Sequence, residues 1–272
     1  MDSAQDSPPP AASQSLMATD GIPEPAWRAG ERATHALRVP LTRQAITEAG
    51  LRVLDRDGID GLSMRRVSEE LGTGPASIYW HVRNKGELLQ LLYERVMEEV
   101  RLPAPDPSRW TEQLRELARQ VRDIMRRHRD VARISLGRIP SGPTIAGLTE
   151  WLFQLMSPAG IPDRTVAYLT DLFGLYVGAY TFEESLGMAS PTGEDLPPDQ
   201  IVTMLRDYMA SLPADRFPHI HRALDHIFDP DADARFEFGI DVILRGLLTY
   251  ATPEMAQDNV TPAAARDAGQ SG

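Results

Sequence analysis

The stretch Gly72–Lys85 limits what this chain can fold into more than any other: it reads Gly-Thr-Gly-Pro-Ala-Ser-Ile-Tyr-Trp-His-Val-Arg-Asn-Lys. The residues before it, 62–71, predict a short helix, because Ser63 can cap its start and Gly72 can end it. Pro75 suits the first position of a second helix, since its φ is already helical and its missing N–H has no intrahelical partner there. Two short helices joined by a glycine-containing turn form a helix-turn-helix, whose second helix can lie in the major groove of DNA.

The second of these helices carries side chains that a core helix would not need. Ile78 and Val82 lie four positions apart and would face inward together. Hydroxyl, indole and imidazole groups crowd the rest of the helix and can contact phosphates or base edges, while Ala76 can touch a thymine methyl. At the start of the next helix, free backbone N–H groups and the cation of Lys85, the only lysine of the chain, could hold a phosphate. The alternative is a set of surface aromatics on an ordinary helical hairpin.

The stretch 41–100 resembles the DNA-binding domain of the TetR family of bacterial transcription regulators. The most specific part of the match is Tyr-Trp-His-Val-x-Asn-Lys at 79–85, supported by matches at 45–46, 58–65 and 71–72. The resemblance implies a helix-turn-helix domain in which Arg65 reads a base and the other side chains mainly contact phosphates or thymines. The expected DNA-binding residues are Ser63, Met64, Arg65, Thr73, Gly74, Pro75, Ala76, Ser77, Tyr79, Trp80, His81 and Lys85.

Two of these positions, Pro75 and Ala76, depart from the tetracycline-repressor class of the family, which has a polar amide followed by a proline there. A side-chain amide can pair with adenine through two hydrogen bonds, whereas proline cannot. We therefore expect a different operator sequence.

The net charge of −11 counts against a nucleic-acid binder, which is expected to show a basic footprint. Even the stretch 41–100 has eight Lys plus Arg against ten Asp plus Glu. DNA binding therefore requires that charge be segregated by face, with basic side chains around the helix pair and the acidic ones on the following helix. We expect modest non-specific affinity, with specificity resting on a dimer and on groove contacts. The basic residues are Arg65, Arg66, Arg83 and Lys85, and the acidic ones are Glu94, Glu98 and Glu99.

Composition excludes several other classes of protein. The chain has no cysteine, which excludes disulfides and thiolate metal sites. No apolar run approaches the roughly 20 residues of a membrane helix, and the N-terminus lacks the basic and apolar regions of a secretory signal. We expect a cytoplasmic protein without a membrane partner. Proline-rich residues 1–40 are expected to be a disordered arm, whose Arg28, Arg32 and Arg38 could reach a minor groove, although a solvated tail is the simpler expectation.

Pro103–Pro107 interrupts the helical pattern and predicts the boundary between a DNA-binding domain at 41–102 and a larger domain at 108–250. Beyond it no stretch alternates like a strand, so the chain is predicted to be all-α, with a disordered tail at 251–272. Arg133–Gly142 is expected to be irregular, and Ala189–Gln200 to be a loop. Longer helices are expected over 42–57, 85–101, 110–128, 144–156, 163–187, 201–212, 218–228 and 234–249.

The larger domain resembles the effector domain of the tetracycline-repressor class, through Trp110, His128-Arg129-Asp130, Leu136-Gly137, Pro140 and a pattern over 236–247. The resemblance implies that helices 163–187 and 234–249 pair with their copies in a second subunit. A two-fold dimer would set its recognition helices about 34–36 Å apart, matching a palindromic operator.

An effector pocket is expected among the helices after residue 110. Its aromatics and methionines favour a bulky, largely apolar ligand, although each one singly is more simply a core residue. Ser135 stands where the class has a metal-binding histidine, and Leu117 and Val121 replace polar pocket residues, so we expect an effector other than a magnesium–tetracycline chelate and no cofactor. Glu183 and Glu184 are interpreted as surface charges. The expected lining is Leu117, Val121, Met125, Ser135, Leu148, Trp151, Tyr176 and Tyr180.

Three histidines, His219, His221 and His226, raise the alternatives of a metal site or an all-helical enzyme. On one helix His219 and His226 share a face that excludes His221, and no well-spaced partner completes a ligand set, so we expect neither a metal nor a catalytic residue. A protein-interaction module is a third possibility. Our hypothesis is a homodimeric, ligand-responsive repressor in which an effector swings helix 85–101 and moves the recognition helices.

Overall fold

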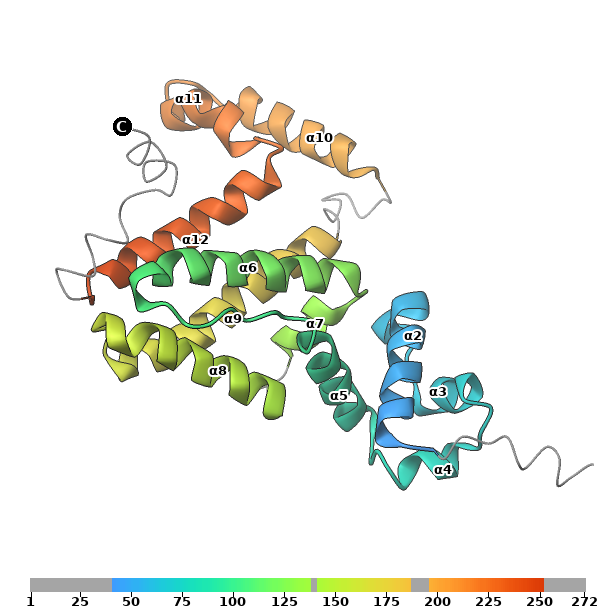
Figure 1. Cartoon of the computed structure of the whole chain (residues 1–272). Coiled ribbons are helices and arrows are strands. Elements are labelled where there is room, and N and C mark those ends of the chain that lie inside the picture. Colours follow the sequence, from blue (N-terminus) through green and yellow to red (C-terminus); the bar gives the residue numbers. More distant parts are fainter. Residues whose placement is uncertain (1–40, 138–140, 187–195, 252–272) are drawn as a thin grey trace, which may run out of the picture. The chain divides into compact units, whose positions relative to one another are not determined.

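The computed structural model describes residues 41–137, 141–186 and 196–251, and all of its helices lie in the part of the chain that begins at Thr42. Every secondary-structure element within these ranges is a helix, which confirms the all-α prediction (Figure 1). The expected N-terminal arm with its three arginines and the expected C-terminal tail from 252 lie outside the described residues. So does most of the expected loop at 189–200, whose last three residues, 198–200, are helical and correct that expectation.

The helices of the N-terminal part begin where polar caps were expected. The hydroxyl of Thr42 accepts a hydrogen bond from the backbone N–H of Ala45 at 3.0 Å, and the hydroxyl of Ser63 accepts one from Arg66 at 3.2 Å. Each cap satisfies a backbone donor that has no partner inside the helix. The helices of this part are α2 (Arg43–Gly61), α3 (Met64–Glu70), α4 (Pro75–Tyr79) and α5 (Lys85–Met97).

Two helix ends differ from the sequence-based expectation. The helix expected to stop before Gly58 continues to Gly61, with a kink at Gly58, whose φ of 72° only glycine adopts readily. The helix expected to reach Arg101 ends at Met97, because the chain tightens into a turn there and then runs extended to the next helix. Apolar residues of that extended linker are therefore free to line a cavity.

The C-terminal part is built from longer helices. Its elements are η1 (Pro107–Arg109), α6 (Trp110–Arg127), α7 (Val131–Leu136), α8 (Pro143–Met156), η2 (Ser157–Ala159), α9 (Asp163–Leu186), α10 (Pro198–Ser211), α11 (Pro218–Ile227) and α12 (Ala232–Leu248). The expectation that 133–142 is irregular is wrong for its first half, because α7 extends to Leu136 before Gly137 ends it. None of the helices in the described ranges is long and apolar enough to cross a membrane.

The core of the C-terminal part forms where α6 packs against α9 and where α7 packs against the same helix. Trp110 and Leu114 of α6 are fully buried, as is Val177 of α9. The linker helix α5 contacts α6, α7 and α8, so the helix that leads out of the helix-turn-helix is itself packed on the body (Figure 1).

Candidate DNA-binding surface and effector cavity

The recognition helix α4 has the two-faced character that its sequence predicts. Ile78 of α4 and Val82, which follows the helix, are fully buried. Tyr79, the last residue of α4, is 51% exposed, and Trp80 directly after it is 89% exposed. A largely exposed indole is unusual on the surface of a monomer. Aromatic side chains can stack on or pack against nucleic acid. The exposed face of α4 can therefore meet a partner.

Most of the expected DNA-binding residues lie on this surface, with two exceptions. Met64 is only 6% exposed, because it occupies the inward face of the first turn of α3 together with Val67, so its side chain is not available to DNA. Lys85 does not extend freely toward a phosphate: its ammonium donates a hydrogen bond to the carbonyl oxygen of Ile59 at 2.7 Å. The residues that do lie exposed are Arg65, Gly74, Pro75, Ala76, Ser77, Tyr79 and Trp80; Ser63, Thr73 and His81 are half-buried.

The end of the recognition helix is held by a charged cluster. The guanidinium of Arg43, at the start of α2, donates hydrogen bonds to the carbonyl oxygen of His81 at 3.3 and 3.2 Å and to Glu87 at 2.6 Å. The other carboxylate oxygen of Glu87 accepts from the backbone N–H of Arg83 at 2.8 Å and from its guanidinium at 3.1 Å. These bonds join the end of α4 to the first turns of α2 and α5.

Ion pairs hold most of the arginines around the helix-turn-helix. Arg65 pairs with Glu69 at 2.6 Å, and Arg52 with Glu70 at 3.0 Å. The hydrogen bonds from Arg83 to Glu87 lower the pKa of that carboxyl, so it remains ionised beside the surface expected to face DNA. The expected segregation of basic and acidic side chains is therefore incomplete, since carboxylates lie among the arginines themselves. Phosphates must compete with them for the same cations.

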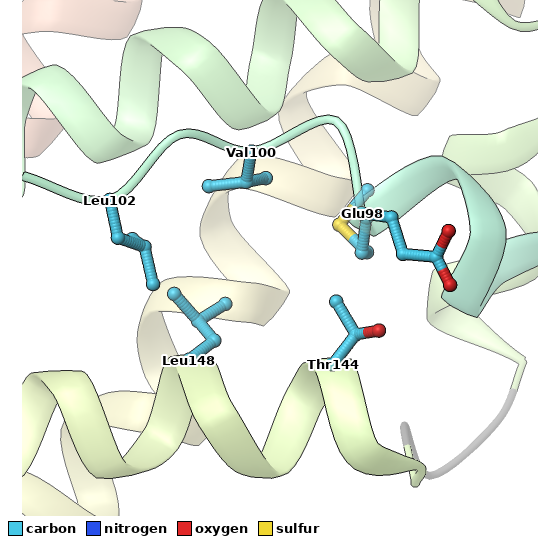
Figure 2. A pocket seen from close by; sticks show the side chains of 6 residues that line it. Glu98, Val100, Leu102, Thr144 and Leu148 are labelled. Carbon is cyan, nitrogen blue, oxygen red and sulfur yellow. The ribbon is translucent and has the colours of Figure 1, made fainter.

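A cavity of about 270 Å³ lies between the extended linker and α8 (Figure 2). In the close view Leu102 and Leu148 point toward one another across it, Thr144 rises from α8, and the carboxylate of Glu98 turns away. The lining is largely apolar, with a single hydroxyl to meet a polar group of a ligand. The lining residues are Met97, Glu98, Val100, Leu102, Thr144 and Leu148.

The structure does not bring the expected effector-binding residues together around this cavity; of them, only Leu148 lines it. Trp151 is buried and donates from its indole N–H to the carbonyl oxygen of Pro103 at 2.8 Å. Ser135 donates to its own helix, at Ala132. Leu117, Val121 and Met125 are buried on the inner face of α6. The sequence did not predict that linker residues line the cavity, because a proline-bounded segment indicates only a domain boundary. The linker lines the cavity because α8 packs against it.

The two tyrosines expected in the pocket instead join α9 to α12. The hydroxyl of Tyr176 donates to the carbonyl oxygen of Phe236 at 2.9 Å, and that of Tyr180 donates to Ala232 at 2.7 Å. Their rings pack on the ring of Phe236, with centroids 5.7 and 5.3 Å away. Gly239 allows this approach, because a Cβ there would collide with the hydroxyl of Tyr176.

A buried arginine lies beside this aromatic cluster and corrects the interpretation of Glu184 as a surface charge. The side chain of Arg122 is 7% exposed and pairs with Glu184 and, at 2.8 Å, with Asp233. Its guanidinium also lies 4.5 Å from the centre of the Phe236 ring. The hydrogen bond with Glu184 raises the pKa of Arg122 further, so it stays charged. A buried guanidinium requires such a carboxylate, which explains why Glu184 turns inward.

Two of the three histidines that raised the possibility of a metal site, His219 and His221, have other partners. His221 lies 2.7 Å from the carbonyl oxygen of Leu212, and His219 lies 2.6 Å from the guanidinium of Arg222. No group of three or more metal-binding side chains occurs in the described part of the chain. The His128 ring, from the motif used for the resemblance, instead lies between Asp55 and Glu99, at 3.1 and 3.0 Å.

A helix-turn-helix with an exposed recognition helix, followed by an all-helical body with an apolar cavity, defines the class of two-part DNA-binding regulators. Two protein-family models match the two parts of the chain. The model of bacterial regulatory proteins of the tetR family matches residues 46–92, and that of the tetracyclin repressor-like C-terminal domain matches residues 102–251. The chain belongs to the TetR family of bacterial transcriptional regulators. The all-helical enzyme is thereby excluded as an alternative.

Individual relatives agree with this assignment. The HTH-type transcriptional repressor DrrR1 of Streptomyces coeruleorubidus is 33% identical over 227 residues, which cover 81% of this chain and 82% of DrrR1. The class D tetracycline repressor of Escherichia coli is 28% identical over 215 residues, covering 78% of this chain and 91% of that repressor. The crystal structure of ActR from Streptomyces coelicolor in complex with actinorhodin is 39% identical with a TM-score of 0.72, covering 79% of this chain and 99% of ActR.

Proposed function

We propose that this regulator is a homodimeric repressor that binds a palindromic operator and releases it when a small, largely apolar effector binds. The observation that carries the DNA-binding part is the exposure of Tyr79 and Trp80 at the end of α4, beside the fully buried Ile78. A repressor role is supported by the relative DrrR1, whose name describes it as a repressor.

The homodimer is supported by an unpaired apolar face on the two helices that the family uses for pairing. Tyr168, Leu172 and Leu175 of α9 are 63%, 51% and 51% exposed, and their spacing places them on one stripe. On α12, Phe238 and Val242 are 71% and 53% exposed and lie one turn apart. A second copy would cover both stripes and set the recognition helices about one DNA turn apart, as a palindrome requires.

The effector site is proposed to be the cavity between the linker and α8. Its apolar lining favours a ligand that buries carbon surface and makes a single hydrogen bond, at Thr144. Its lining lacks the carboxylate–histidine set that a magnesium chelate would need, so the effector is proposed to bind without metal. ActR, which was solved with actinorhodin and with (S)-DNPA, makes these two compounds the first to test.

The test is selection of bound duplexes from a random DNA pool, scored for palindromy, at fixed low salt. The wild-type protein is expected to enrich one palindromic motif. The double variant Tyr79→Ala/Trp80→Ala should lose that enrichment while remaining folded, since Trp80 is 89% exposed and Tyr79 51% exposed. Tyr208→Ala, which truncates a tyrosine 64% exposed on α10, is the matched control and should select the same motif. If the wild-type protein enriches no motif, or one without two-fold symmetry, the proposal is wrong.

A further inference from the structure

The first turn of α8 is capped by a carboxylate from another helix. Glu94 of α5 accepts hydrogen bonds from the backbone N–H groups of Thr144 at 3.0 Å and Ile145 at 3.4 Å. No side chain at the start of α8 does this, since its N-cap residue is Gly142 and proline follows. Glu94 is only 8% exposed. A buried carboxylate is stabilised at this place because the free N–H groups and the helix dipole both favour negative charge there.

The backbone before α8 is shaped around this carboxylate. Gly142 has a φ of 146°, in the region that favours glycine, and a Cβ at that position would collide with the side chain of Glu94. One turn earlier on α5, the side-chain amide of Gln90 donates to the carbonyl oxygen and the hydroxyl of Ser141, at 2.8 and 2.5 Å. We call these contacts of Gln90 and Glu94 with residues 141–145 the α5–α8 clasp.

The clasp lies directly beside the cavity. Thr144, whose N–H group Glu94 binds, lines the cavity together with Leu148 one turn further along α8. Met97, three positions after Glu94, lines it from the end of α5. Figure 2 shows Thr144 and Leu148 rising from α8 toward the linker that leaves α5. Both helices that the clasp joins therefore contribute to the wall of the cavity.

At its other end α5 supports the recognition helix. Asn84 caps α5 through a 2.9 Å bond from the N–H of Glu87, and Glu87 holds Arg83 and Arg43, which in turn binds the end of α4. Hydrogen bonds and ion pairs therefore join the first turn of α5 to the end of α4. The clasp is the contact through which the effector domain can act on α5.

We propose that Glu94 is the positioning residue that couples occupancy of the cavity to the orientation of the DNA-reading helices. The inference rests on the proposed function, since it takes the cavity as the effector site. With the carboxylate in place, the first turn of α8 and the end of α5 move together, so a wedge between linker and α8 turns α5. Without the Glu94 carboxylate, the first turn of α8 deforms by itself, and the wedge does not change the orientation of α4.

The test replaces the unidentified effector by a wedge built into the chain, Leu148→Trp, which fills the cavity from α8. Operator affinity is measured for the wild-type chain, Leu148→Trp, Glu94→Gln and the double variant, each full-length and checked by circular dichroism. We expect Leu148→Trp to change the operator Kd by about 10-fold or more in the wild-type background and by less than about 3-fold in the Glu94→Gln background. Equal fold-changes in both backgrounds, or no response in the first, overturn the proposal.

Two further variants keep the comparison specific. Glu150→Gln makes the same chemical change at an exposed position of α8, where the carboxylate accepts a hydrogen bond from Gln154, and should leave the response to Leu148→Trp intact. Gln90→Ala loosens the clasp without disturbing the buried carboxylate, and should reduce the response partly. If Glu150→Gln abolishes the response as Glu94→Gln does, the effect belongs to charge on α8 in general and the proposal is wrong.

A second readout does not require DNA. Amide hydrogen exchange over residues 75–97 is measured in the same variants without operator. We expect Leu148→Trp to alter exchange in α4 and α5 only where Glu94 is present; the same alteration in the Glu94→Gln background overturns the coupling. A chain that binds no palindrome would refute the proposed function, yet this measurement would still decide whether the clasp transmits.

Discussion

The guanidinium of Arg43 binds the carbonyl oxygen of His81, 38 positions away, through two hydrogen bonds of 3.3 and 3.2 Å. His81 lies at the end of the recognition helix, whereas Arg43 opens α2, so the orientation of the DNA-reading helix depends on a residue outside the helix-turn-helix. Glu87 fixes the same guanidinium at 2.6 Å.

Removing this contact should weaken operator binding more than it weakens the fold. We expect Arg43→Ala to raise the operator Kd by about 10-fold, because α4 loses the anchor at its end, while the free energy of unfolding falls by less than about 1 kcal/mol, as for an exposed ion pair. Operator titration and chemical unfolding measure the two. Arg52→Ala, which breaks the exposed pair with Glu70, is the control; an equal loss of affinity there would show that only net charge matters.

The pH dependence of stability should report the cluster at Glu87. The hydrogen bonds from Arg83 lower the pKa of this carboxyl in the folded state. Its contribution is therefore fully present above the ordinary Glu value of about 4.3 and is lost as the pH falls through the lower folded-state value. Unfolding followed between about pH 3 and 7 should show a Glu87→Gln variant that differs from wild type at neutral pH and converges with it in acid. A difference that grows in acid would contradict this assignment.

Arg122 should be one of the costliest single positions to truncate in the body. Arg122→Met leaves Glu184 without its cation in a largely buried place, and we expect a loss of about 3 kcal/mol in the free energy of unfolding. The double variant Arg122→Met/Glu184→Leu should recover part of this loss. Arg119→Met, which removes a more exposed guanidinium paired with Glu237, should cost less than about 1 kcal/mol. Similar losses for Arg122→Met and Arg119→Met, measured by urea unfolding, would argue against a buried ion pair.

The proposed dimer interface can be tested by placing charge on it. Leu172→Glu/Phe238→Glu puts carboxylates on both exposed apolar stripes, and we expect the protein to sediment as a monomer and to lose high-affinity operator binding. Tyr208→Glu, at an exposed aromatic of α10, should remain a dimer. Sedimentation velocity over a range of concentrations distinguishes the two. A double variant that still sediments as a dimer would place the interface elsewhere.

Local signals in the sequence predicted much of the fold. Thr42 and Ser63 cap helices as expected, and Ile78 and Val82 are buried as their spacing predicted, although α4 already ends at Tyr79. Caps and apolar periodicity act over one or two turns, so they can be read from neighbouring residues alone. The motif at 79–85 carried enough information to indicate the family, which the comparisons confirmed.

The partners of polar side chains could not be read in this way. Lys85 binds the carbonyl oxygen of Ile59 in α2, 26 positions away, and Glu94 caps α8, 50 positions away. Both contacts form because α5 packs against α2 and against α8. Met64 was expected to contact DNA but is buried, for a related reason. Whether a residue beside a helix cap faces the solvent or the core depends on which elements pack over it. The cavity likewise exists only because α8 lies against the linker.

By itself, therefore, the sequence determined that this chain is all-α and carries a helix-turn-helix with an exposed aromatic face, since periodicity and capping are properties of adjacent residues. Only the tertiary structure decided which carboxylate meets which cation, which linker residues line the cavity, and that Glu94 caps α8 beside that cavity. These contacts are made by residues far apart in the chain, and burial is what makes them strong.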